Sequence, residues 1–409
     1  MKNFFKNNWF LCTMILGIVL GCVVGFVWPN ASVLEPLGTI FTNLMFCVVV
    51  PMVFCSISSA IANMSSVKKA GKVMGVTVGT FFVTAAIAAV IMYIVCRIIP
   101  VYTVAPSYEA ASEIGKVDIA SLVINFFTKP DFPELWSRRA ILPLIVAGIF
   151  FGFGVQMAGG PETMTAKLLA DVNRVLMNVV KIITYYAPIG FFGFFASLVA
   201  THGADFVSNY ARAVIMYYVV AFAYFLLSSP VYARFGGGTG AAKIMFSHLF
   251  RPAVTSFGTC SSVATIPTNV DVATRTGISQ DVRNIVLPMG ATMHMDGSAM
   301  GAIMKVAFLF GIFGMDFTSG QAIVAIIVAV FSSVAMSGIP GGGGVGELVL
   351  CSIFFPDQMA VAYPIAIALG NLIDPPATMI NAAGDYVVCF IVSRFVDGKD
   401  WLQKHLHGK

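Results

Sequence analysis

The sequence has little charge for its length. Only 11% of its 409 residues are Asp, Glu, Lys or Arg, whereas 58% are hydrophobic and the mean hydropathy is +0.88. Because soluble domains are about 25% charged, this composition excludes a water-soluble protein. The net charge of +5 is small and forms no compact basic patch, which argues against nucleic-acid binding.

Paired cysteines are also lacking. The eight cysteines are scattered through apolar stretches without any C-x-x-C pair, which argues against a zinc site or a disulfide framework. A nucleophile with its base is not evident either, because Ser261 and Ser262 have no base beside them and His294 lies on another segment. We therefore expect no enzyme and no covalently bound cofactor.

The sequence does contain many apolar runs of the roughly 20 residues that a helix needs to cross a bilayer. The first run follows Lys2 and Lys6 and resembles a signal peptide, but it is long enough to span and no small-residue cleavage site follows it. We expect it to be retained as the first of six clear spans: Trp9–Val27, Leu37–Met64, Gly71–Ile99, Ile141–Met157, Val172–Ala200 and Ala211–Ala233.

Basic residues near the span ends predict the orientation, because cytoplasmic loops are enriched in Lys and Arg. If each span crosses once, they fall on one side: Lys2, Lys6, Lys68, Lys69, Lys72, Arg234, Lys243, Arg251, Arg394, Lys399, Lys404 and Lys409. We therefore expect a multi-pass protein of the cell inner membrane with both termini cytoplasmic. The long polar loop from Pro100 to Arg139 then lies outside.

Two later apolar segments are interrupted in the middle. Phe246–Val270 is broken at Ser256–Pro267, and Ala322–Phe355 is broken at Ser332–Pro340, which four glycines follow. Each glycine costs about 1 kcal/mol in a helix interior relative to alanine. Because irregular backbone at membrane depth survives only inside protein or beside a wet cavity, we expect two re-entrant helical hairpins.

Each predicted hairpin is followed by an apolar span with its own polar interruption. Val286–Met315 is interrupted at Gly290–Ser298, and Val361–Val392 is interrupted at Asn371–Asp385. A hairpin followed by a broken helix thus occurs twice, entered from opposite sides, as in inverted-repeat transporters with a solute site between the repeats. The predicted fold is an all-α membrane protein with inverted repeats.

Three aspartates lie inside these segments, where a carboxylate is costly and usually faces a cavity or a partner. Asp374 and Asp385 are 11 residues apart, close to three helical turns, so they share a face with Thr378 and Asn381 if the helix is continuous. Their oxygens suit an alkali cation such as Na⁺. Proton relay through the same aspartates is the alternative, which His294 keeps open.

A purely structural pairing also remains open for these charges. The aspartates have Lys305, Arg283 or Arg394 as candidate partners, and Lys305 itself either pairs with Glu347 or extends outward. An ion channel is the other rival class, but a channel arranges identical filters around an axis, whereas this chain has two unlike hairpins.

Several motifs resemble the dicarboxylate/amino acid:cation symporters, the glutamate-transporter family. They are Thr265-Ile266-Pro267, Met295-Asp296-Gly297-Ser298, the tip Ser337 to Gly341, the series Asp374, Thr378, Asn381, Gly384 and Asp385, and Tyr186 to Gly190. The resemblance implies eight transmembrane helices, two hairpins, a homotrimer in the lipid bilayer and elevator-type transport. It also implies a scaffold at 1–240, of which span 3 and part of span 6 move with the core, a transport core at 241–396 and a cytoplasmic tail at 397–409.

The resemblance further implies roles for individual residues. The substrate would contact Ser261, Ser262, Ser337, Gly338, Asp374, Ala377, Thr378 and Asn381. Sodium would lie near Thr84, Gly290, Thr292, His294, Asp296, Ser333, Asn381 and Asp385. The amine of an amino acid would then pair with Asp374, since a cation and a carboxylate form a strong hydrogen bond.

Departures from the family pattern bear on the solute. Ala377 stands where acidic-substrate members have an arginine, and Cys260 stands where some members have one. Without either guanidinium, a side-chain carboxylate would lose its bidentate partner. We therefore predict Na⁺-coupled uptake of a neutral amino acid, with proton-coupled uptake of a dicarboxylate or acidic amino acid as the alternative. His294 replaces the usual asparagine and Ser298 the usual threonine, so the coupling ion is open at this point.

Overall fold

The computed structural model describes residues 9–62, 68–102, 124, 128–137, 140–335 and 343–407. All regular elements in these ranges are helical, as the composition predicts for an all-α membrane protein. The first half consists of α2 (Trp9–Val27), η1 (Ala31–Leu34), α3 (Glu35–Ala62), α4 (Lys68–Ile98), α6 (Phe132–Leu135), α7 (Ile141–Met157), η3 (Gly160–Glu162), α8 (Met164–Thr184) and α9 (Ala187–Gly237).

One predicted span in this half is wrong. Val172–Ala200 was expected to be a single helix, but a turn at Tyr185 and Tyr186 divides it between α8 and α9. Pro188 lies in the first turn of α9, where its missing N–H costs nothing, so it starts a helix here. The long α9 is bent at Gly203, whose φ of 72° lies in the region that favours glycine.

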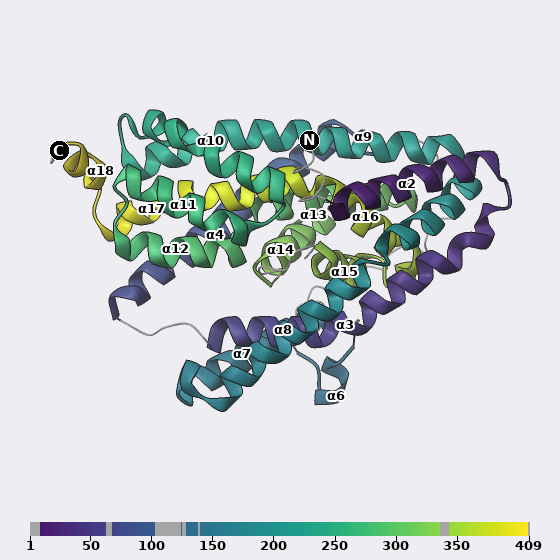
Figure 1. The fold of residues 1–409 in the computed structure, drawn as a ribbon, viewed down its shortest axis with the longest axis horizontal. Coiled ribbons are helices and arrows are strands. Elements are labelled where there is room, and N and C mark those ends of the chain that lie inside the picture. The colour runs from purple at the N-terminus through teal and green to yellow at the C-terminus, as the bar shows by residue number, and fades with distance from the viewer. Residues whose placement is uncertain are drawn as a thin grey trace.

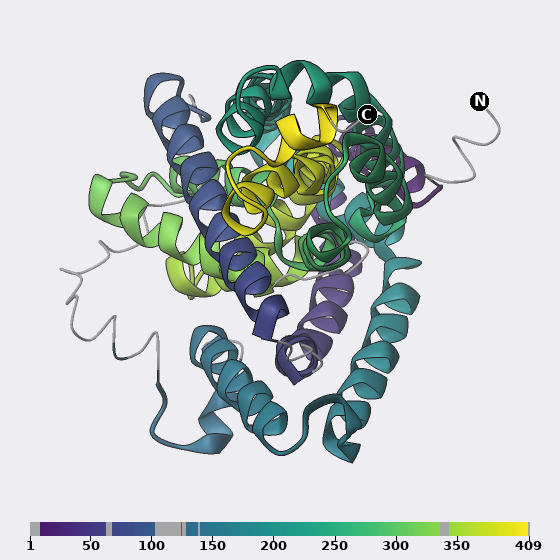
Figure 2. The same cartoon turned by 90° about the vertical axis from the view of Figure 1, so that its left-hand side faces the viewer.

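Helices α3, α7 and α8 lie together and make few contacts with the C-terminal half, at α14, α15 and α16, whereas α4 packs against α13 and α9 packs against α17 (Figures 1 and 2). The first-half helices carry large apolar side chains on their outer faces, with Phe150 72% and Leu227 70% exposed. Apolar surface of this extent suits contact with lipid rather than water.

The C-terminal half begins with a helical hairpin at the predicted place. Helix α10 (Ala241–Thr259) and α11 (Ser262–Thr276) pack against each other and are joined at Cys260 and Ser261. Cys260 has a φ of 48°, and no other non-glycine residue in the described ranges has a positive φ. Strained backbone of this kind is often found at ligand sites.

The next helix is broken, also as predicted. Helices α12 (Gln280–Met293) and α13 (Asp296–Ile312) are separated by His294, which is extended, and Met295, which is also non-helical. Helices α14 (Ser319–Ala335) and α15 (Gly343–Phe354) follow, and the predicted second tip at 336–342 lies outside the described residues. Gly343 and Gly344 begin α15 and are not in its interior.

The last predicted break is narrower than expected. Helix α16 (Met359–Thr378) continues through a π-helical turn, η4 (Met379–Ala383), into α17 (Gly384–Val396), and α18 (Trp401–His407) follows. The expectation of an interruption over Asn371–Asp385 is therefore wrong in extent. A π turn widens the helix locally and frees carbonyl oxygens without unwinding it, and such turns are frequent at functional sites.

Four helical segments in the described part are long and apolar enough to cross a bilayer: Lys72–Ile98, Val207–Gly237, Gln280–Ile312 and Met359–Val396. The last two are mostly buried inside the protein. The end of α9, the start of α10 and the end of α17 lie at one end of the molecule (Figure 1). The eight-span count and the direction in which the chain sits in a membrane remain predictions.

Candidate functional site

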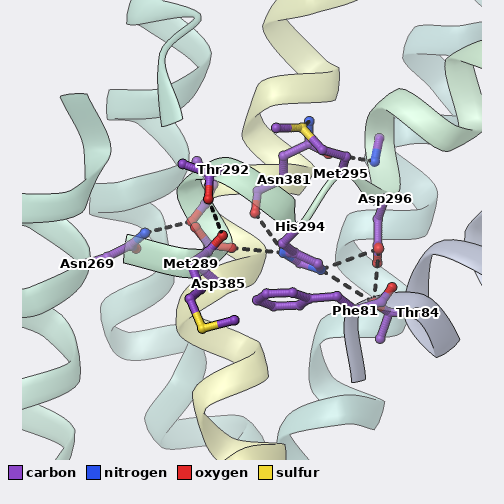
Figure 3. Close-up of polar contacts among 12 residues, drawn as sticks. Phe81, Thr84, Asn269, Met289, Thr292, His294, Met295, Asp296, Asn381 and Asp385 are labelled. Carbon is purple, nitrogen blue, oxygen red and sulfur yellow. Dashed lines mark hydrogen bonds and ion pairs between the residues drawn. The ribbon is translucent and has the colours of Figure 1, made fainter. Parts of the chain in front are cut away.

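A buried polar cluster forms where α4, the break between α12 and α13, and the π turn meet (Figure 3). His294 is its centre and is 2% exposed. Its Nδ1 lies 3.0 Å from Asp385 Oδ1 and 3.0 Å from the Asn381 carbonyl oxygen. Its Nε2 lies 3.3 Å from Asp296 Oδ1. One imidazole ring therefore joins the two buried aspartates.

Asp296 receives further hydrogen bonds from two other helices. The Thr84 hydroxyl of α4 donates to Oδ1 at 2.9 Å, and the Tyr224 hydroxyl of α9 donates to Oδ2 at 3.0 Å. Asp296 is also the first residue of α13, where the helix dipole favours a negative charge. Both carboxylate oxygens of Asp296 thus accept hydrogen bonds from other helices.

Asn381 ties the π turn to the start of α13. Its side-chain oxygen accepts from the Gly297 N–H at 2.8 Å, and its side-chain amide donates to Ser298 Oγ at 3.0 Å. One carbonyl group of the π turn also has a side-chain partner, since Asn269 Nδ2 donates to the Ala382 oxygen at 2.6 Å. Unpaired carbonyl groups would be costly this far from water.

Two glycines leave the space that the cluster occupies. A Cβ at Gly384 would lie 2.7 Å from His294 Cε1, and a Cβ at Gly290 would clash with the Asp385 carboxylate. Phe81 of α4 stacks on the imidazole, with ring centroids 4.9 Å apart. The ring and the Asp385 carboxylate are therefore held closely on several sides.

We expect Gly290→Ala to lower the unfolding temperature, because the added methyl group displaces the Asp385 carboxylate from His294. Overpacking of this kind costs about 1–3 kcal/mol. The matched control is Gly258→Ala in α10, where a Cβ meets nothing within 4 Å. Tryptophan fluorescence during heating in detergent measures the unfolding temperatures of both variants. Equal unfolding temperatures for the two variants would contradict the close contact.

Asp374 has a different environment. It is partly exposed, whereas Asp296 and Asp385 are buried, and its Oδ1 accepts from the Thr378 hydroxyl at 2.9 Å. The ion pairs in the described part of the chain include none to Asp374. Of the three predicted carboxylates, Asp374 is thus the one with access for a solute.

The other predicted site residues are placed as follows. Ser261 caps α11 by accepting from the Ala264 N–H at 3.2 Å, and Ser262 begins that helix. Ala377 is buried, with its backbone against Gly297. The Thr292 hydroxyl bonds to the Met289 carbonyl of its own helix. Ser333 belongs to α14, but its side chain, like Ser337 and Gly338, lies outside the described residues.

Sequence reasoning missed several contacts of the cluster: those of Phe81, Tyr217, Tyr224 and Asn269. Tyr217 donates to the Gly297 carbonyl at 2.7 Å, beside the bond from Tyr224 to Asp296. Both tyrosines lie seven residues apart in α9, which places them on one face of the helix. Two tyrosine hydroxyl groups on one face of an apolar span were the sequence feature that could have predicted these contacts.

A family model described as the sodium:dicarboxylate symporter family matches residues 10–395. The chain belongs to this family. A C4-dicarboxylate transport protein of Bacillus subtilis is 26% identical over 406 residues, which cover 95% of this chain and 94% of that protein. C4-dicarboxylate transport protein 2 of Bradyrhizobium diazoefficiens is 24% identical, covering 93% of this chain and 87% of that protein. The protein of that class from Cupriavidus necator is also 24% identical, with coverage of 93% and 90%.

Membership of the sodium:dicarboxylate symporter family confirms the resemblance drawn from the motifs and makes the chain a multi-pass membrane protein of a transporter family. The family's name and its relatives' names agree better with the alternative prediction, a dicarboxylate, than with the neutral amino acid.

Proposed function

We propose that this protein is a secondary symporter of the cell inner membrane that uses a cation gradient to take up a small amino acid, a neutral one in preference to an acidic one. The observation that carries the choice of solute is Asp374, a partly exposed carboxylate that accepts a hydrogen bond from the Thr378 hydroxyl. An ammonium group is its natural complement, because charge-assisted hydrogen bonds are about twice as strong as neutral ones.

The charges around Asp374 favour a zwitterion over a dianion. Lys305 is the buried cation that interacts electrostatically with Asp374, but its ammonium is already paired with Glu347. Ala377 offers no donor at the position one turn before Asn381. A second carboxylate on the solute would therefore lie near Asp374 without a cation to balance it, which costs several kcal/mol in a low-dielectric site.

A C4-dicarboxylate is the second candidate, favoured by the names of the similar transport proteins. It requires that donors at the hairpin tips, Ser261 and Ser262 with Ser337 and Gly338, take both carboxylates. Half-helix N-termini favour anions, so the start of α11 suits one of them.

The remaining parts of the proposal come from the family resemblance. Residues 1–240 act mainly as a scaffold in a homotrimer, and residues 241–396 carry the solute across the bilayer by an elevator movement, with 397–409 as a cytoplasmic tail. The packing of α4 on α13 agrees with the idea that span 3 moves with the transport core. Sodium or a proton is the coupling ion.

Uptake into proteoliposomes tests the choice of solute. Labelled serine, alanine, aspartate and succinate are compared under an inward Na⁺ gradient, an inward proton gradient and neither. We expect a neutral amino acid to be accumulated and succinate to compete weakly, and Ala377→Arg to shift the preference toward the dianions by supplying a bidentate guanidinium. Accumulation of succinate that no amino acid inhibits would establish the dicarboxylate candidate instead.

A further inference from the structure

The buried ion pair of Lys305 and Glu347 lies beside the proposed solute site. A Cβ at Gly370 of α16 would lie 3.5 Å from Lys305 Nζ and 2.5 Å from Glu347 Oε1. Gly370 and Asp374 are four residues apart in that helix, so they lie on one face. The pair is therefore one helical turn from the carboxylate to which we assign the ammonium group of the solute.

The packing of α13 on α16 gives the same position independently. A Cβ at Gly297, at the start of α13, would meet Ala377. A Cβ at Gly301, one turn later in α13, would meet Ile373, one turn earlier in α16. The two helices therefore run antiparallel, and Lys305, one turn further along α13, reaches the next turn of α16. Its side chain is only 5% exposed, so the ammonium does not extend outward to water.

The charges near Asp374 come from this pair. Lys305 and Glu347 both interact electrostatically with Asp374, and their charges have opposite signs. The ammonium pairs with Glu347 Oε1, and Glu347 Oε2 has no hydrogen-bond partner among the described residues, so the carboxylate depends on Lys305. The other groups that interact with Asp374 are two phenols and a thiol, which are neutral at pH 7: Tyr217, Tyr218 and Cys260. The three charged side chains thus leave a single negative charge, which one ammonium group balances.

We propose that Glu347 is a specificity-determining residue that acts through Lys305. Its carboxylate neutralises the ammonium of Lys305 and prevents that charge from offsetting Asp374, so the site selects a solute with an ammonium group over a dianion. Without the carboxylate, Lys305 would balance Asp374 and would repel an ammonium group while attracting a second carboxylate. The inference rests on the proposed uptake of a neutral amino acid and extends it to a residue that does not touch the solute.

The test is a ratio of affinities in proteoliposomes. Alanine and succinate are compared as inhibitors of uptake of the labelled amino acid that wild type accumulates. Glu347→Gln keeps the size and hydrogen bonding of the side chain and removes its charge. We expect it to shift the ratio of the two inhibition constants toward succinate by about tenfold, because a unit charge within several ångströms acts strongly where water is scarce. A pair with only a structural role would weaken both inhibitors alike and leave the ratio unchanged.

Two further variants keep the charge balance at Asp374. Glu347→Asp retains the carboxylate, and the double variant Lys305→Met with Glu347→Met removes both charges of the pair. We expect the ratio of wild type from each, and also from Glu162→Gln in the exposed pair with Lys167.

An unchanged ratio in Glu347→Gln would overturn the inference. A shift toward succinate in the double variant would do the same, and this test remains if Glu347→Gln does not fold. A wild-type protein that takes up succinate and is inhibited by no amino acid would instead remove the proposed solute.

Discussion

Asp374→Asn is expected to weaken amino-acid uptake by about 10- to 150-fold in apparent affinity, because a hydrogen bond to a charged group contributes about 1.5–3 kcal/mol. The substitution keeps the shape of the side chain and removes its charge. It leaves the Thr378 hydroxyl with an acceptor, so stability changes little. Uptake of labelled amino acid at several concentrations, with unfolding temperature measured in parallel, checks both parts.

The matched control for this prediction is Asp271→Asn in α11. Asp271 is also an aspartate of the C-terminal half, but its side chain is 38% exposed and pairs with Arg251 and Arg275. These arginines lower the pKa of the Asp271 carboxyl, so it is ionised at neutral pH. We expect normal uptake from this control. If Asp374→Asn transports the amino acid as wild type does, or improves uptake of a dicarboxylate, the assignment of Asp374 to an ammonium group is wrong.

Lys305→Met is expected to lower the free energy of unfolding by about 3–5 kcal/mol, since removing one partner leaves a buried charge uncompensated. Lys305 of α13 pairs with Glu347 of α15, and both side chains are nearly inaccessible, at 5% and 1% exposure. Gly370 of α16 makes room for the pair, because a Cβ there would press on the Glu347 carboxylate. The pair thus joins α13 to α15, with α16 packed closely beside it.

The double variant Lys305→Met with Glu347→Met separates charge from packing. Replacing a buried ion pair by apolar side chains of similar volume is often neutral or stabilising, so the double variant should recover most of the loss. Lys167→Met removes one partner of the exposed pair with Glu162 and should change stability by less than about 1 kcal/mol. Thermal unfolding in detergent measures the stability of these variants relative to wild type. If Lys305→Met is as stable as wild type, the pair contributes no net stability.

Two positions of the C-terminal half at which the chain departs from regular helix could be predicted from the sequence. The turn at Cys260 and Ser261 and the break at His294 and Met295 both fall inside intervals marked by small polar residues, glycine and proline. These signals are local, because each residue type alters the backbone at its own position. In the last helix the predicted interruption was too long, because Pro375 and Pro376 are accommodated within α16 and only the π turn departs from α-helix.

The choice of candidate aspartates could also be predicted, because charge inside an apolar span is rare and costly. Their partners could not. The possible pairing of Lys305 with Glu347 was one of two alternatives, and the structure confirms it. For Asp296 and Asp385, pairing with Lys305, Arg283 or Arg394 was considered, whereas their partner is His294.

Composition and local pattern therefore predicted a polytopic helical membrane protein with polar interruptions in its C-terminal half, since transfer from water to lipid depends on each residue's own chemistry, and the motifs added the transporter family. Three-dimensional packing was needed to reveal that an imidazole bridges the two aspartates and that Tyr224 and Thr84 donate to one of them. Thr84 and Asp296 are 212 positions apart. Whether such residues meet depends on how each helix is rotated about its axis against its neighbours, which no short stretch of sequence specifies.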